Sequence, residues 1–263
     1  MNFIKNIYNN LIKYKFLISE LIKRDFKVKY QRSFFGILWS ILYPVLMMLV
    51  MAIVFSNLFK ASMPEVNYLC YLLTGLVIFN FFTDATNQAM PSIVGNMSLI
   101  NKVYMPKYIF PLSKCLFSGI NFLLTLIPLY GVIILTGTGL NIYHLLLPYC
   151  FFTLLIFCIG FGFLLSAFSV FLRDLFYIWG IITLTWTYLT PIMYDMSILP
   201  IKLLELMKYN PLYQYINFAR EIILFNRVPE LSCWLYCGGF ALITLLIGTW
   251  YFKKKQDRFI YYI

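Results

Sequence analysis

Long stretches without charged side chains are the feature that most limits how this chain can fold. They cover residues 33–59, 66–83, 115–172, 175–194 and 231–252. An α-helix needs about 20 mostly apolar residues to cross a hydrocarbon core of roughly 30 Å, and four of the stretches are close to that length. Only 12% of the residues are charged, against roughly 25% in soluble domains, so the sequence predicts an all-α integral membrane protein.

The stretch 115–172 has 58 residues, which is too long for one crossing. Near its middle, Gly137-Thr138-Gly139 and Asn141 form a run of turn-forming residues, so we expect two helices joined by a hairpin. Six transmembrane helices are therefore predicted, at about 34–58, 67–90, 113–136, 145–170, 175–193 and 231–252. They form one transmembrane domain over 33–252, between a segment 1–32 and a tail 253–263.

The basic residues predict which side of the membrane each loop occupies. An even number of crossings puts both termini on one side, and if that side is the cytoplasm, 16 Lys and Arg lie inside and 5 outside. Four of those five belong to the long connection 195–230, where the positive-inside bias is weak. We therefore expect cytoplasmic termini and short interfacial or re-entrant helices over 195–230 on the external face.

Charge and motif content narrow the classes of function. The net charge is +11, but eight basic residues fall in the first 32 residues and four in the last eleven, which is typical of segments facing an anionic inner leaflet and not of nucleic-acid binding. The six cysteines form no CxxC pair and there is one histidine, so we expect buried cysteines and no metal site. No phosphate loop or nucleophile motif occurs, so no cofactor is expected on this chain.

Residues 9–32 are predicted to form an amphipathic helix on the cytoplasmic leaflet. Apolar side chains recur every four residues on one face, at Tyr14, Ile18, Ile22, Phe26 and Tyr30. The other face carries Lys13, Glu20, Lys23, Arg24 and Lys27. Asp25 falls on the apolar face, where it either meets a buried partner or turns towards water near the helix end.

Asp84 is the one acid within an otherwise apolar span, and Asn80, Asn87 and Gln88 lie on the same helical face. A polar stripe costs several kcal/mol against lipid, so it should face the bundle interior or an aqueous path. Two explanations remain open, which are hydrogen bonds between helices and a role in transport. Aromatic residues make up 20% of the chain; their composition favours an interfacial belt, although an aromatic lining would also suit sugars.

The segment 98–111 mixes large apolar, aromatic and basic residues with two prolines. A solvated loop would not need so many apolar side chains. Either a short cytoplasmic helix docks on another protein, or the segment packs against the helix 9–32.

Four stretches of the sequence carry a family resemblance. Residues 21–44 resemble the opening of the ABC-2 type permeases that export polysaccharides such as O-antigen, capsule and teichoic acid. Three later stretches resemble the same family and occur in the order found there. They are 96–111, Arg173-Asp174 followed by 190–194, and 210–213 followed by Arg220.

The resemblance implies a homodimer of six-span subunits in the bacterial cytoplasmic (inner) membrane. Two copies of a separate ABC ATPase subunit would hold ATP and Mg, and the substrate would be a polysaccharide linked to undecaprenyl diphosphate. By the same resemblance, 96–110 is the coupling helix that contacts the ATPase, and 195–230 contains the external gate helices. The coupling residues would be Asn101, Lys102, Tyr104, Pro106 and Lys107.

The family resemblance also suggests which residues contact the substrate. Lys23, Lys27, Lys29 and Arg32 stand near the cytoplasmic entrance, where a diphosphate needs cations, although anchoring to anionic lipids explains them equally well. A path between two copies would be lined by Trp39, Tyr43, Asn80, Asp84, Asn87, Tyr188 and Tyr194. The alternatives are an ABC-2 permease for a drug or lipid, and a membrane enzyme acting on polyprenyl-linked sugars.

Overall fold

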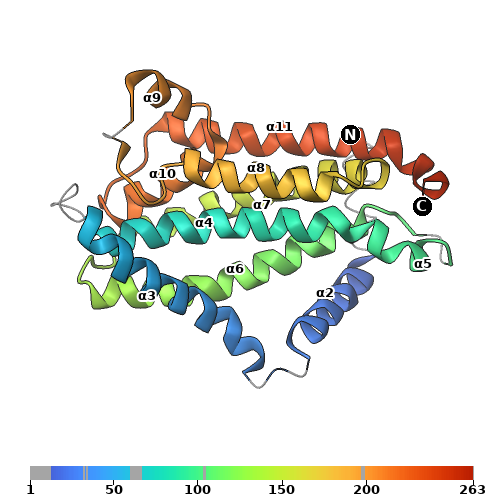
Figure 1. Cartoon of the computed structure of the whole chain (residues 1–263), viewed down its shortest axis with the longest axis horizontal. Helices are drawn as coiled ribbons and strands as arrows, with labels where there is room; N and C mark the ends of the chain where they lie inside the picture. Colours follow the sequence, from blue (N-terminus) through green and yellow to red (C-terminus); the bar gives the residue numbers. More distant parts are fainter. Residues whose placement is uncertain are drawn as a thin grey trace.

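The computed structural model describes residues 13–31, 33, 35–59, 67–102, 105–196 and 199–262, and every regular element among them is a helix (Figure 1). This confirms the all-α class. The α-helices are α2 (Lys15–Tyr30), α3 (Trp39–Phe59), α4 (Tyr68–Ala89), α5 (Met97–Ile100), α6 (Ile109–Leu135), α7 (Leu147–Phe171), α8 (Leu175–Leu189), α9 (Ile201–Met207), α10 (Pro211–Ile223) and α11 (Leu231–Lys255). Short 3-10 helices include η3 (Met90–Ser92), η4 (Val94–Asn96), η5 (Ile142–Leu146) and η7 (Gln256–Tyr261).

Four helices in the described part of the chain are long and apolar enough to cross a membrane. They run over Tyr68–Ser92, Ile109–Leu135, Ile142–Phe171 and Leu231–Phe259. The other two expected spans correspond to α3 and α8, so six crossings remain a prediction. With 15 residues α8 extends about 22 Å, and it ends at Thr190 because a residue before proline disfavours helical backbone.

A tight turn joins α6 to the helices that follow it. Gly137 and Gly139 have φ of 70° and 81°, the left-handed region that glycine adopts without steric cost. Asn141 then starts η5 by accepting a hydrogen bond from the backbone of Tyr143 at 2.8 Å. The predicted hairpin within 115–172 is therefore confirmed.

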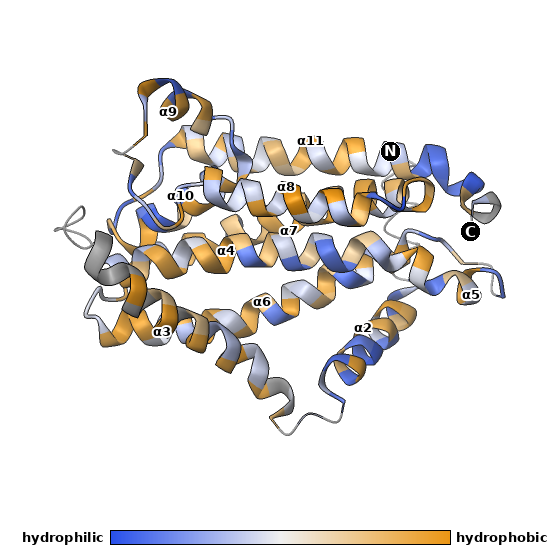
Figure 2. Ribbon diagram, in the orientation of Figure 1, coloured by the Kyte–Doolittle hydropathy of each residue, from blue (hydrophilic) through white to orange (hydrophobic). Residues whose placement is uncertain are grey.

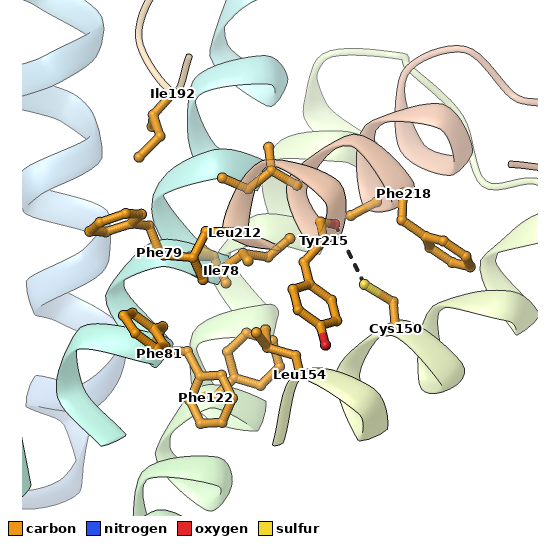
Figure 3. Packing of buried hydrophobic residues seen from close by; sticks show 14 of the residues in the cluster. Ile78, Phe79, Phe81, Phe122, Cys150, Leu154, Ile192, Leu212, Tyr215 and Phe218 are labelled. Carbon is orange, nitrogen blue, oxygen red and sulfur yellow. Dashed lines mark hydrogen bonds between the residues drawn. The ribbon is translucent and has the colours of Figure 1, made fainter. Parts of the chain in front are cut away.

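The main hydrophobic core lies between α4, α6, α7, α10 and α11. Figure 3 shows α10 beside α4, α6 and α7, with the Tyr215 side chain directed towards α7. The Tyr215 hydroxyl donates to the carbonyl of Cys237 at 2.8 Å, and the backbone carbonyl of Tyr215 accepts from the Cys150 thiol. Since α10 buries most of its side chains here, it is an integral part of the bundle and not a surface excursion.

The six cysteines are all free and buried, as expected from their apolar surroundings. Five of them, Cys70, Cys150, Cys158, Cys233 and Cys237, belong to this main core.

A second hydrophobic core closes the opposite end of the bundle. It combines Ile18 and Leu21 of α2, the 93–110 region, the end of α7, Phe252 of α11 and Phe259 of η7. In Figure 1, α2, α5 and the chain after α11 accordingly lie at the same end. Figure 2 shows hydrophilic residues concentrated on α2 and at the end of α11, next to the hydrophobic bundle.

Helices α7 and α11 pack with their backbones close together at two glycines. A Cβ added to Gly248 would lie 2.2 Å from the carbonyl oxygen of Gly160, and a Cβ added to Gly160 would lie 2.5 Å from the backbone of Thr244. Small residues let membrane helices approach in this way and so maximise packing.

We predict that Gly248→Ala destabilises the protein by about 1–3 kcal/mol, because backbone atoms cannot move aside as a flexible side chain can. Thermal unfolding in detergent measures the effect. Gly239→Ala on the same helix is the matched control, since an added Cβ there meets nothing within 4 Å. Equal melting temperatures for the two variants would contradict the close packing of α7 and α11.

Candidate functional site

The amphipathic helix α2 buries the predicted face. Ile18, Leu21 and Asp25 are buried, and Lys23 and Lys27 on the other face are exposed. Asp25 is only 7% exposed, and its carboxylate lies 2.8 Å from the Lys114 ammonium on α6 and 3.1 Å from the Arg24 guanidinium. The structure therefore shows an ion-pair partner for Asp25 inside the protein, the half-buried Lys114, and a partner for Asp25 was one of the two explanations open from sequence.

A polar cavity of about 580 Å³ opens beside this ion pair, between α2, the end of α4 with η3 and η4, and the start of α6. Arg24 crosses it and donates to the Asn96 side-chain oxygen at 3.0 Å. The buried Ser92 hydroxyl also lines it and makes no protein hydrogen bond. The cavity is lined by Arg24, Asp25, Val28, Asn87, Gln88, Pro91, Ser92, Gly95, Asn96 and Lys114.

The polar stripe on α4 leads to this cavity. Asn80, Asp84 and Asn87 are exposed, although most of the other side chains of α4 are buried. Gln88 donates to Asp84 at 3.2 Å and to Ser118 of α6 at 3.0 Å. Interhelical hydrogen bonding therefore accounts for Gln88, while Asn80, Asp84 and Asn87 remain on an exposed face.

The predicted entrance lysines are placed differently. Lys23, Lys27 and Lys29 are exposed on α2, but none of them lines the cavity. Lys23 pairs with Glu20 at 2.8 Å, and the Lys29 ammonium lies 5.5 Å from the centre of the Phe117 ring. Arg32 lies outside the described residues. The cations at the cavity are Arg24 and Lys114, which the sequence did not single out as entrance residues.

The predicted path aromatics occupy two other places. Trp39 and Tyr43 are 42% and 60% exposed on α3, one turn apart on one face. Tyr188 is exposed near the end of α8, and the Tyr194 hydroxyl donates to its carbonyl at 2.9 Å. Within one copy of the chain, these side chains do not line the cavity beside Asn87.

The predicted coupling segment is helical over only part of its length. After α5 ends at Ile100, Asn101 and Lys102 are exposed, and the chain becomes helical again at Ile109. Met97, Ile100, Ile109 and Phe110 are buried in one hydrophobic cluster with Ile18 and Leu21 of α2, so packing within the chain explains these apolar residues. Pro106 is half-buried, Lys107 donates to the carbonyl of Gln256 at 2.7 Å, and Tyr104 lies outside the described residues.

Arg220 connects the sequence motifs at the other end of the molecule. It is 3% exposed on α10, and its guanidinium donates to the carbonyls of Pro191 at 2.8 Å, Ile192 at 3.0 Å and Tyr71 at 3.2 Å. The guanidinium carbon also lies 3.3 Å from the centre of the Tyr71 ring. Burial lowers the pKa of Arg220 to about 10, opposed by Tyr71 and Tyr213, so the side chain stays charged at neutral pH.

Asn210 makes a second connection between these motifs. Its side chain caps α10 by accepting from the backbone of Tyr213, accepts from the Trp186 indole at 3.0 Å and donates to Thr190 at 3.0 Å. The motifs 190–194 and 210–213 thus meet through Asn210 and Arg220 at one cluster.

One polar network was not identified from sequence. The Tyr30 hydroxyl bonds to Ser40 of α3 and donates to the buried Asn121 of α6 at 3.1 Å. This ties the end of α2 to α3 and α6. An asparagine within the apolar run 115–172 was the available signal, because buried amides need partners.

The described helices therefore form an apolar bundle with an exposed polar face on α4 that leads to a cavity beside Arg24, Asp25 and Lys114. The ABC-2 type transporter family matches residues 17–224, which is most of the chain. The protein belongs to this family.

Three relatives align along nearly the whole chain. An O-antigen export system permease protein RfbA from Klebsiella pneumoniae is 29% identical over 245 residues, covering 92% of this chain and 93% of the relative. The protein of the same name from Myxococcus xanthus is 25% identical, covering 96% and 97%. The polysialic acid transport protein KpsM of Escherichia coli is 21% identical, covering 94% and 96%.

We predict that Lys114→Met lowers stability by about 2–3 kcal/mol, somewhat below the roughly 3–5 kcal/mol for a fully buried pair, because Lys114 is partly exposed. Thermal unfolding in detergent tests this. Lys23→Met is the control, since the exposed pair with Glu20 should contribute less than about 1 kcal/mol. Equal melting temperatures for the two variants would show that the Asp25–Lys114 ion pair does not stabilise the protein.

We predict that Arg220→Gln frees the segment 190–194 from α10, because a shorter neutral amide cannot reach all three carbonyls that the guanidinium fork bonds. Amide hydrogen exchange over 190–196 should accelerate, and Arg220→Lys should restore only part of the protection. Arg227→Gln, which removes an exposed arginine shortly after α10, should leave this exchange unchanged. Unchanged exchange in Arg220→Gln would rule out the connection.

Proposed function

We propose that this chain is the permease subunit of an ABC exporter that moves a polysaccharide linked to undecaprenyl diphosphate across the bacterial cytoplasmic membrane. Its family membership and its full-length relatedness to O-antigen and capsule export permeases support this. Membership in the family also implies a separate ABC ATPase subunit, which supplies ATP and Mg. The chain would cross the membrane six times with both termini in the cytoplasm.

The observation that carries a transport role is the exposed stripe of Asn80, Asp84 and Asn87 on α4. Polar side chains exposed to hydrocarbon cost several kcal/mol, so this face requires water or a second polypeptide. A path between two copies of the chain satisfies both conditions. The stripe ends at the cavity beside Arg24 and Lys114. We propose that an anionic headgroup enters there, because these two cations can bind its phosphates.

Three exposed aromatic side chains, Trp39, Tyr43 and Tyr188, and the half-buried Tyr194 fit the same arrangement. In the proposed dimer, Trp39 and Tyr43 face the path, and Tyr188 and Tyr194 stand at its outer end. Aromatic rings present flat surfaces to the C–H faces of sugars, so successive residues of a polymer can slide past without tight binding. The exposed lysines Lys23, Lys27 and Lys29 meet the diphosphate or the anionic lipid surface. Asn101 and Lys102 are exposed for contact with the ATPase.

Deletion of the gene, followed by complementation, tests the function and the stripe together. The deletion strain should lose its surface polysaccharide and accumulate the lipid-linked polymer inside the cell. The wild-type chain should restore export, whereas a chain with leucine at Asn80, Asp84 and Asn87 should not, because the path loses its hydrated wall. Surface labelling with an antibody or lectin measures the polymer.

Leu123→Ala is the matched control, because Leu123 is 58% exposed but belongs to an apolar groove on α6. It should export normally. A deletion strain that keeps its surface polysaccharide would favour the drug or lipid permease. Normal export by the triple leucine variant would show that Asn80, Asp84 and Asn87 do not line the path.

A further inference from the structure

The chain after α11 folds back onto the predicted coupling segment. Phe259 in η7 is fully buried, with its ring centre 5.4 Å from that of Phe252 and 5.9 Å from that of Phe171. It belongs to the same hydrophobic cluster as Met97 and Ile100 of α5. A solvated tail would not bury its phenylalanine, so this segment is part of the folded structure.

Lys107 fixes the tail to the chain that leads into α6. Its ammonium donates to the Gln256 carbonyl at 2.7 Å and lies 5.7 Å from the centre of the Phe259 ring. Burial lowers the pKa of Lys107, and the nearby Asp257 carboxylate acts in the opposite direction. The Lys107 ammonium therefore binds a group of this chain, whereas Lys102 is exposed.

The exposed residues Asn101 and Lys102 lie between two parts of the chain that are held in place. Asn101 and Lys102 follow α5, whose Met97 and Ile100 are held by the second hydrophobic core, and they precede Lys107, which is held by the tail. A segment fixed at both ends transmits a force applied to its middle, whereas a segment loose at one end yields to it.

We propose that residues 256–262 act as a positioning element for ATPase coupling, with Lys107 and Phe259 holding the 97–109 segment so that movement of the ATPase at Asn101 and Lys102 reaches α6. The proposal rests on the proposed function, because it assumes an ATPase partner. Lys107 is a positioning residue here and not itself an ATPase contact.

The test uses the full chain reconstituted in liposomes with its ATPase partner and the lipid-linked polysaccharide. Polymer transported and ATP hydrolysed are measured in the same sample. Lys107→Met and Phe259→Ala should each lower the polymer transported per ATP by about fivefold or more, the lower end of typical coupling effects, while the complex stays assembled. Lys107→Arg, which keeps a donor and a charge, should recover most of the ratio.

Arg258→Gln is the matched control, because Arg258 is exposed in the same short helix and should leave the ratio unchanged. If Lys107→Met keeps the wild-type ratio, or if transport and hydrolysis fall together with the amount of folded protein, the positioning role is overturned. The Lys107 variants keep the test valid if Phe259→Ala does not fold. A wild-type chain without ATP-dependent transport would instead overturn the proposed function.

Discussion

The cost of placing polar groups against hydrocarbon governs this structure. Two buried charges lie within the bundle and meet defined partners: Asp25 pairs with Lys114, and Arg220 donates to three backbone carbonyls. Each of these contacts joins segments that are far apart in the sequence. Removing one partner would leave a desolvated charge, so the positions of α2 and α10 depend on both partners of each contact.

The two ends of the molecule are organised by different means. At the end that holds α10, Asn210 and Arg220 connect α10 to the turn after α8 and to α4. At the opposite end, a separate hydrophobic core collects α2, α5, the start of α6 and the tail. Because α4, α6 and α7 run between these ends, packed helices join the proposed coupling segment to the region around Arg220.

The exposed surfaces of a single copy are as informative as its core. Asn80, Asp84 and Asn87 stand on a face of α4 that is unsuited to lipid, and Trp39 and Tyr43 stand on an exposed face of α3. A dimer supplies the missing wall in the proposed function.

The sequence by itself determined the helical class, the apolar spans, the turn at Gly137 and Gly139 and the buried face of α2, because each depends on local periodicity and backbone preference. It also indicated that Asp25 and Asp84 lie at positions otherwise occupied by apolar residues. Only the tertiary structure decided that Asp25 pairs with Lys114, that Arg24 and not Lys27 reaches the cavity, and that Lys107 binds the tail. Those contacts depend on the rotation and spacing of helices distant in the chain, which a pattern along one helix does not encode.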